Sequence, residues 1–221
     1  MNKNLFTGTG VALVTPFRKQ ETIDFSKLES LIEHIIQSGV DYIVALGTTS
    51  EAATMTASER SALQDFIVET TNGRIPIMLG LGGNNTQSVT DAILHTNFDG
   101  ISGILSVAPF YNKPNQRGIA QHFKLIADAS PVPVIIYNVP GRTGINIAAS
   151  TTIQLAQECP NIIGIKEASG NIAQVMEIIA NKPENFKVIS GDVLMTKLLH
   201  EMERRGEKYG LVTFCIGGGW V

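Results

Sequence analysis

The sequence predicts an α/β protein built as a TIM (β/α)8 barrel, and three observations support that fold class. Apolar runs of strand length recur about every thirty residues, and helical patterns lie between them. Polar residues cluster directly after each run. No dinucleotide-binding glycine motif follows a strand, because Gly8-Thr9-Gly10 precedes the first one. A barrel is therefore favoured over a doubly wound sheet.

Seven apolar runs are the expected strands: residues 11–14, 42–46, 75–79, 104–107, 134–137, 162–165 and 186–189. The first helix is expected between Asp24, as its N-cap, and Gly39, which ends it. Thr56 and Glu59 form a capping-box pattern that begins the second helix. Two asparagines stand where later helices should begin, namely Asn146 and Asn171.

Composition describes a globular protein and excludes several classes of partner. The 221 residues are 43% hydrophobic and carry a net charge of −3, with no basic stripe, so nucleic acid is not an expected partner. No apolar run is long enough for a membrane span, and no secretion signal is evident, which favours the cytoplasm. Cys159 and Cys215 are too few for a metal cluster, and the four histidines, expected on helix surfaces, lack zinc-ligand spacing. No metal site is predicted.

Lys166 is the centre of the predicted active site. A barrel places its chemistry in the loops that follow the strands. The polar clusters after the strands are residues 47–51, 80–85, 109–114, 137–143, 166–167 and 190–192. Lys166 ends an apolar run, so its amine should lose hydration, which lowers the pKa of a lysine and favours Schiff-base formation. The alternative is an ordinary lysine that closes a strand and points to water.

Schiff-base chemistry needs further groups around the amine. Tyr137, one strand earlier, is a candidate acid/base if its pKa is lowered. Thr48 and Thr49 offer hydroxyl and N–H groups for a carboxylate, and Arg142 can grip a second carboxylate through two hydrogen bonds. Each has a structural alternative: a strand aromatic for Tyr137, turn residues for the threonines, and a surface arginine for Arg142.

Four motifs, in this order and spacing, resemble the 4-hydroxy-tetrahydrodipicolinate synthase (dihydrodipicolinate synthase) family of pyruvate-dependent class I aldolases: residues 47–51, 111–114, 137–143 and 164–168. The resemblance covers about residues 5–192. It implies a barrel-fold lyase that condenses pyruvate with L-aspartate 4-semialdehyde at the entry to diaminopimelate and lysine biosynthesis. It also implies a covalent imine between Lys166 and pyruvate, with no separate cofactor.

The resemblance assigns roles to the other candidates. Tyr137 would be the acid/base, with Thr48 and Tyr111 completing a proton relay, and Tyr111 would cross a dimer interface into the neighbouring site. The backbone of Thr48 and Thr49 would hold the pyruvate carboxylate, and Gly191 would also contact substrate. These assignments imply a homodimer or a homotetramer.

Arg142 would bind the carboxylate of the semialdehyde, which argues against the alternative of a related pyruvate-dependent sugar-acid aldolase. Four positions that differ from lysine-inhibited members predict weak lysine feedback: Ala57, Arg60, Ser88 and Phe110.

The C-terminal segment is expected to be foreign to this family. Residues 1–192 contain barrel units one to seven, whereas residues 193–221 resemble a helix and strand near the end of a thiolase, with Cys215 in its glycine-rich loop. Residues 211–216 are expected to pair with residues 11–14 as an eighth strand, and the family's C-terminal helical region is missing. The alternative function is therefore a catalytically impaired chimeric fragment.

Overall fold

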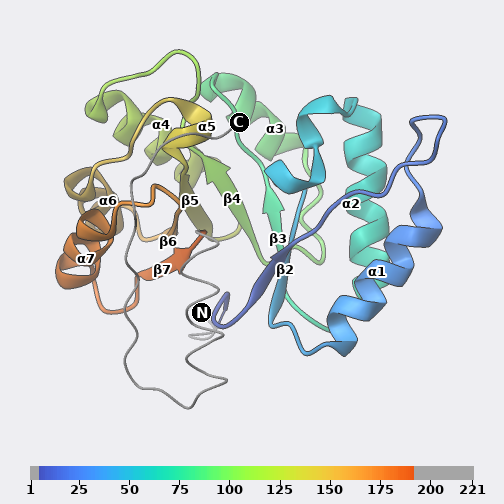
Figure 1. The fold of residues 1–221 in the computed structure, drawn as a ribbon. Helices are drawn as coiled ribbons and strands as arrows, with labels where there is room; N and C mark the ends of the chain where they lie inside the picture. The colour runs from blue at the N-terminus through green and yellow to red at the C-terminus, as the bar shows by residue number, and fades with distance from the viewer. Residues whose placement is uncertain (1–4, 192–221) are drawn as a thin grey trace, which may run out of the picture.

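The seven expected strands are all present, and they lie side by side in one curved sheet (Figure 1). A computed structural model of the chain describes residues 5–191. The strands follow one another in sequence order, and every neighbouring pair is parallel. Helices cover the outer side of the sheet (Figure 1). This is the topology of seven consecutive units of a (β/α)8 barrel, so the predicted fold class is confirmed.

The strand bounds agree with the expected runs to within two residues. The strands are β1 (Gly10–Ala12), β2 (Tyr42–Ala45), β3 (Ile77–Gly80), β4 (Gly103–Val107), β5 (Val134–Asn138), β6 (Ile162–Glu167) and β7 (Lys187–Ser190). The helices are α1 (Phe25–Gln37), η1 (Thr48–Ser50), η2 (Ala52–Thr54), α2 (Ala57–Thr71), α3 (Thr86–His95), α4 (Gln116–Ala129), α5 (Pro140–Thr143), α6 (Ala149–Glu158) and α7 (Ile172–Asn181). The elements η1 and η2 are short 3-10 helices.

The core has two layers because side chains of a strand alternate between its faces. On β2, Ile43 and Ala45 join the larger cluster between sheet and helices, whereas Tyr42 and Val44 face the interior of the sheet. Phe6 closes the N-terminal end of that interior, where its ring lies edge-on to Tyr42 at 5.4 Å between centroids. The interior therefore opens at the carboxyl ends of the strands.

Most helix starts follow the sequence prediction. Asp24 accepts from the backbone N–H of Lys27, and Thr56 and Glu59 form both hydrogen bonds of a capping box. Asn171 caps α7. The prediction for Asn146 is wrong, because α6 begins three residues later with Ala148 as its N-cap; the Asn146 side chain is hydrogen-bonded elsewhere.

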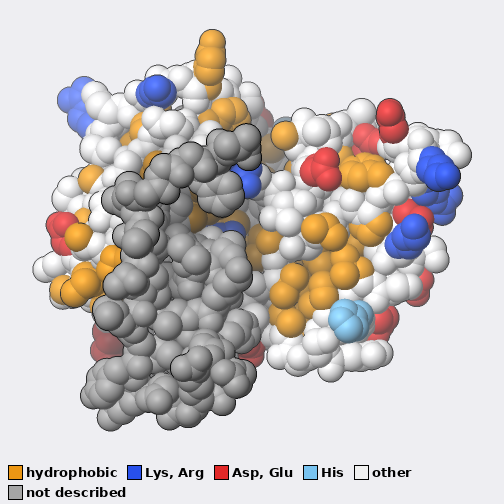
Figure 2. Space-filling model, in the orientation of Figure 1, with side chains coloured by type: hydrophobic (Ala, Val, Ile, Leu, Met, Phe, Trp, Pro, Cys, Tyr) orange, Lys and Arg blue, Asp and Glu red, His pale blue; other side chains and the backbone are white. Residues whose placement is uncertain are grey.

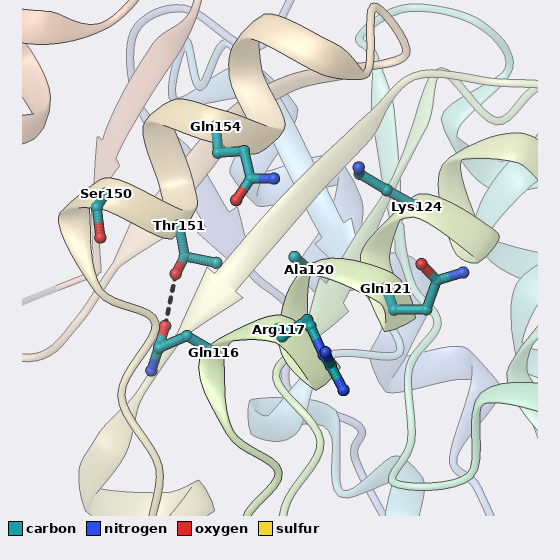
Figure 3. Close-up of a pocket in the computed structure, with 8 residues that line it drawn as sticks. All are labelled: Gln116, Arg117, Ala120, Gln121, Lys124, Ser150, Thr151 and Gln154. Carbon is teal, nitrogen blue, oxygen red and sulfur yellow. Dashed lines mark hydrogen bonds between the residues drawn. The ribbon is translucent and has the colours of Figure 1, made fainter.

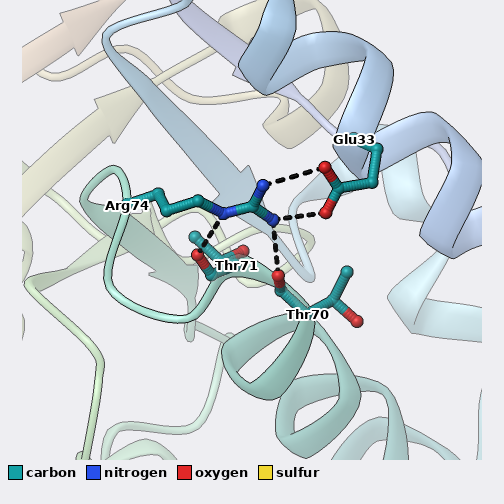
Figure 4. A network of polar contacts seen from close by, with 4 residues as sticks. All are labelled: Glu33, Thr70, Thr71 and Arg74. Carbon is teal, nitrogen blue, oxygen red and sulfur yellow. Dashed lines mark hydrogen bonds and ion pairs between the residues drawn. The ribbon is translucent and has the colours of Figure 1, made fainter.

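An ion pair fastens α1 to the C-terminus of α2 (Figure 4). The Arg74 guanidinium contacts both carboxylate oxygens of Glu33 and also donates to the carbonyl oxygens of Thr70 and Thr71. The hydrogen bonds from Arg74 lower the pKa of Glu33. Arg74 therefore satisfies two carbonyl groups that the end of α2 leaves without helical partners.

His122 is buried, contrary to the expectation that the histidines lie on helix surfaces. Its side chain is only 3% exposed, and its Nδ1 lies 2.8 Å from the Thr86 hydroxyl, which joins α4 to α3. Burial lowers the pKa of His122 to about 4. His34 and His95 are exposed, as predicted, and His200 lies outside the described residues.

The two end strands of the described sheet are less covered than its centre. Val14, just after β1, is 50% exposed, and apolar side chains gather on the face between β2 and α1 (Figure 2). The predicted eighth strand, residues 211–216, and the tail that carries it lie outside the described residues. Within residues 5–191, no helix has the length and apolar character that crossing a membrane requires.

Candidate active site

Lys166 and Tyr137 face each other at the carboxyl end of the sheet. They are direct register partners on β6 and β5, so their side chains leave the same face of neighbouring strands. The Lys166 Nζ lies 4.6 Å from the centroid of the Tyr137 ring, within the range of a cation–π contact. The sequence placed the two on adjacent strands, and the structure brings them into contact.

The amine of Lys166 has the environment that the sequence predicted. Its side chain is partly buried, and burial lowers its pKa because a charged ammonium group loses hydration there. A larger fraction of the amine is therefore uncharged and nucleophilic near neutral pH than for a lysine in water.

The pKa of the Tyr137 phenol is raised in this structure, not lowered. Burial raises its pKa, whereas the positive charge of Arg142 acts in the opposite direction with a smaller effect. The sequence made Tyr137 a candidate acid/base on the condition that its pKa is lowered, and this structure does not meet that condition. Tyr137 carries its proton near neutral pH, so it can donate a proton or a hydrogen bond to a substrate oxygen before it accepts one.

Gly191 lies against the other side of the Lys166 side chain. A methyl group built on Gly191 would lie 2.8 Å from Lys166 Cε and 3.0 Å from Ala168 Cβ, so a side chain at this position would displace the lysine. The Gly191 N–H donates to the Glu167 carbonyl oxygen at 2.8 Å. The Lys166 side chain thus lies between the Tyr137 ring and the backbone of Gly191.

A polar network that the sequence analysis missed lies behind Lys166, on the helix side of the sheet. Its buried members, Asn138, Glu167 and Gln174, are joined by hydrogen bonds of 3.0–3.1 Å. Asn138 and Glu167 directly follow Tyr137 and Lys166, so strand alternation turns them to the opposite face. The sequence did contain a signal for this network, because a polar residue directly follows each of the two candidate catalytic residues.

The predicted carboxylate-binding threonines lie on η1, directly after β2. Thr48 and Thr49 are exposed, whereas Ser50 is buried and its hydroxyl donates to the Gly47 carbonyl oxygen at 2.8 Å. The Thr15 hydroxyl donates to the Ser50 carbonyl oxygen and fastens this turn. Among the described contacts, no hydrogen bond joins either threonine to Tyr137 or Lys166.

Arg142 lies on the single turn α5 that follows β5. The turn is fixed by buried Thr143, whose hydroxyl donates to the Ile145 carbonyl oxygen at 2.9 Å. The Arg142 side chain is exposed, but its charge reaches Tyr137 and opposes the rise in the pKa of that phenol. Arg142 therefore lies within electrostatic range of the predicted acid/base.

Tyr111 is not part of this cluster within the described chain. It lies in the loop between β4 and α4, is 86% exposed, and has a left-handed backbone with φ of 68°. Such a backbone is costly for an aromatic residue and is maintained only by its surroundings. Asn112, the next residue, donates to the Asn84 carbonyl oxygen at 3.3 Å and holds the loop against the one that follows β3.

A separate open groove lies on the helical surface between α4 and α6 (Figure 3). Gln116 accepts a hydrogen bond from the Thr151 hydroxyl across it, and Lys124 forms an ion pair with Glu158. None of the predicted site residues lines this groove. In residues 5–191, no group of three or more His, Cys, Asp or Glu side chains has the arrangement of a metal site.

Comparison with known proteins identifies the family of the chain. A family model described as "Dihydrodipicolinate synthetase family" matches residues 5–206. The chain belongs to this family. The match ends at residue 206, not at Asp192, so the family resemblance extends beyond the predicted boundary. The thiolase resemblance proposed for residues 193–219 has no support in these comparisons, and those residues lie outside the described part of the chain.

Individual relatives agree with the family match. The chain is 52% identical, over 84% of its length, to a 4-hydroxy-tetrahydrodipicolinate synthase of Parabacteroides distasonis, of which it covers 62%. A crystal structure of the chloride-inhibited dihydrodipicolinate synthase of Acinetobacter baumannii, complexed with pyruvate, aligns with a TM-score of 0.80 at 42% identity, over 84% of this chain and 63% of that one. A monomeric dihydrodipicolinate synthase variant aligns with a TM-score of 0.83 at 35% identity, over 86% of this chain and 64% of the variant.

The chain spans less than two thirds of the length of these relatives.

Proposed function

We propose that this chain carries out the Schiff-base chemistry of a 4-hydroxy-tetrahydrodipicolinate synthase, a lyase that condenses pyruvate with L-aspartate 4-semialdehyde. The observation that carries the proposal is the partly buried amine of Lys166, 4.6 Å from the Tyr137 ring. Burial lowers the pKa of this amine, as a nucleophilic lysine requires. Similarity to annotated synthases such as that of Parabacteroides distasonis supports the choice of substrates.

The first half of the reaction forms the imine. The uncharged Lys166 Nζ adds to the C2 carbonyl carbon of pyruvate, and the carbonyl oxygen takes up a proton to give a carbinolamine. Protonated Tyr137 is placed to give that oxygen a second proton, so that it leaves as water and an iminium ion remains. The resulting phenolate can then accept the proton that the pyruvate methyl group loses in the next step.

The second half forms the carbon–carbon bond. The iminium ion withdraws electrons, so the pyruvate methyl group loses a proton and becomes an enamine. The enamine carbon attacks the aldehyde carbon of the semialdehyde, and the aldehyde oxygen takes up a proton. The amino group of the semialdehyde moiety then adds to the imine carbon, closes the ring and releases Lys166.

Substrate carboxylates need donors at the mouth of the interior. In this proposal the backbone N–H groups of Thr48 and Thr49 hold the pyruvate carboxylate, and Gly191 contacts pyruvate beside Lys166. Arg142 binds the carboxylate of the semialdehyde through two parallel hydrogen bonds, which a lysine cannot provide. The electrostatic effect of Arg142 on the Tyr137 phenol is consistent with a place near the reacting groups.

Tyr111 is proposed to act on the site of a second copy. It is 86% exposed in this chain and makes no described contact with Lys166, so a proton relay through Tyr111 requires a homodimer or a homotetramer. A family variant described as monomeric shows that assembly is not uniform among relatives. A cytoplasmic location and weak lysine feedback belong to the same proposal.

The proposal is tested by intact-mass analysis after incubation with pyruvate and borohydride, which reduces an imine to a stable secondary amine. We expect one pyruvate adduct that maps to Lys166 by peptide analysis. Lys166→Met should abolish it, and Lys27→Met, at an exposed lysine of α1, should not. A soluble, folded parent chain without an adduct would refute the proposal.

Turnover is the second arm of that test. Release of the cyclic product after addition of L-aspartate 4-semialdehyde would support the full reaction. An adduct that forms without turnover would identify the chain as the catalytically impaired fragment that the sequence analysis considered.

A further inference from the structure

We infer that Glu167, paired with Asn138, is the positioning residue that fixes Lys166 relative to Tyr137 and ties both to the loop that carries Arg142. This inference rests on the proposed function, and it concerns side chains on the opposite face of the sheet from the reacting amine. Neither Glu167 nor Asn138 faces the pyruvate side of β6. Each acts through the neighbour that precedes it in the chain.

Both carboxylate oxygens of Glu167 accept hydrogen bonds. The Asn138 Nδ2 lies 3.1 Å from each oxygen, the Ser169 N–H donates to Oε1 at 2.9 Å, and Gln174 Nε2 donates to Oε2 at 3.0 Å. No salt bridge within residues 5–191 includes Glu167. A buried carboxylate that is 3% exposed and satisfied by uncharged donors alone is costly to maintain for stability.

The pair continues the register that sets the catalytic contact. Tyr137 and Lys166 are opposite each other, and Asn138 and Glu167 are the next opposite pair. The Ala168 N–H also donates to the Asn138 carbonyl oxygen at 2.9 Å. The ends of β5 and β6 are therefore joined by side chains and by backbone directly beyond the lysine, where parallel strands would otherwise separate.

Glu167 also controls the other side of the lysine. Its carbonyl oxygen accepts from the Gly191 N–H, and Gly191 is the residue whose backbone lies against Lys166 Cε. A displacement of Glu167 would therefore change both walls that confine the amine.

Asn138 extends the network to the loop of Arg142. Its Oδ1 accepts from the Ile147 N–H at 3.0 Å, and its Nδ2 donates to Asn146 Oδ1 at 2.8 Å. Asn146 in turn donates to Gln174 Oε1 at 2.7 Å. The loop after β5 is thus fixed at its far end to the same carboxylate that positions Lys166.

Accurate placement has large kinetic effects, since a displacement of about 1 Å can slow a reaction about a hundredfold. Glu167→Gln would place its amide N–H group against the amide N–H group of Asn138, and Asn138→Asp would place its carboxylate against that of Glu167. The double swap, Asn138→Asp with Glu167→Gln, restores one acceptor and one donor in the pair, and the new carboxylate at position 138 still accepts from the Ile147 N–H. The side-chain amides of Asn146 and Gln174 must exchange their oxygen and nitrogen positions to meet the new partners, and their mutual hydrogen bond allows this.

The experiment measures the time course of the pyruvate adduct under borohydride at several pyruvate concentrations, with circular dichroism as the check on folding. A positioning role predicts that each single variant reacts at least about tenfold more slowly at saturating pyruvate. The final extent should be unchanged, and the half-saturating pyruvate concentration should stay within about twofold. The double swap should return the rate constant to within about threefold of the parent.

The outcomes separate this inference from the proposed function. No adduct with the parent chain would overturn both. A parent adduct with folded single variants that react at the parent rate would overturn the positioning role alone. A lower final extent with an unchanged rate constant would identify a merely structural role and would also overturn it. If neither single variant folds, the folded double swap provides the test. A rate constant within threefold of the parent value supports the inference, and a rate constant outside that range refutes it.

Discussion

The centre and the ends of this sheet differ in how completely they are packed. All five residues of β5 are buried, as are four of the six residues of β6, including Ile165. In contrast, β1 and β7 contain no buried residue, and β7 ends in exposed Ser190. Lys166 and Tyr137 therefore lie on strands that are far better covered than the two ends of the described sheet. The groups that would form the imine are thus supported by a part of the fold that does not need a closed barrel.

The proposed binding groups show the opposite pattern. Thr48, Thr49 and Arg142 lie on exposed turns, and Gly191 follows the weakly covered β7. The difference suggests that imine formation and binding of the second substrate depend on separate parts of the structure.

The largest expected effect comes from a matched pair of isoleucines. Ile165, on β6, is fully buried, whereas Ile189, on β7, is half-buried. Ile165→Ala should lower the free energy of unfolding by about 3 kcal/mol, because it leaves a cavity in the core. Ile189→Ala should cost about 1 kcal/mol, since less apolar area is lost. Urea denaturation measures both, and equal losses would contradict the difference between centre and edge.

The second prediction concerns His122 on α4. In the unfolded chain the imidazole has a pKa near 6.5, and burial lowers it to about 4 in the folded chain. The unfolded state therefore binds more protons between these values, so stability is complete above pH 6.5 and falls as the pH decreases toward 4. The expected loss is about 3 kcal/mol.

The variant His122→Phe provides the control for this pH dependence. It should flatten the dependence of unfolding free energy on pH in that window. If the parent and the variant lose stability in parallel, His122 is not the cause.

Gly191→Ala should affect chemistry more than stability. The added methyl group would lie 2.8 Å from Lys166 Cε, so the lysine must move. We expect pyruvate trapping to slow about tenfold, equivalent to about 1.4 kcal/mol in the barrier. Gly141→Ala is the matched control, because a methyl group there meets nothing within 4 Å. Similar trapping rates for both variants would show that β7 does not confine the amine.

The smallest effect distinguishes two N-cap asparagines. Asn171 caps α7, which carries Gln174 of the buried network, and Asn115 caps α4. Replacement of either by alanine should cost about 1 kcal/mol of stability. Only Asn171→Ala should also slow pyruvate trapping, by about twofold, because the Gln174 backbone N–H loses its partner. Equal trapping rates for Asn171→Ala and Asn115→Ala would show that the N-cap of α7 does not influence the reactivity of Lys166.

Much of this structure could be predicted because its signals are local. Apolar runs located all seven strands, and Asp24, Thr56 and Asn171 marked helix starts by hydrogen bonds that span three residues. The lowered pKa of Lys166 also followed from its position in an apolar strand. Each of these features depends on residues that are near one another in the sequence.

The failures concern contacts between distant residues. Asn146 has the composition of an N-cap, but its side chain bonds to Asn138 and Gln174, which lie on other elements. The raised pKa of Tyr137 depends on how deeply the interior encloses the ring, and no local pattern reports that depth. The buried network behind Lys166 likewise becomes visible only when β5, β6 and α7 are placed together.

Hydrogen exchange with mass spectrometry tests the central claim most directly, because protection reports the local free energy of opening. We predict that amides of β5 and β6 exchange far more slowly than those of β1 and β7. We also predict that reduction of the pyruvate imine further protects β5, β6 and the residues after β7, leaving β1 unchanged. Uniform protection across the sheet, or faster exchange in β5 and β6 than at the ends, would contradict the claim that the lysine–tyrosine pair rests on a more stable part of the fold than the ends of the sheet.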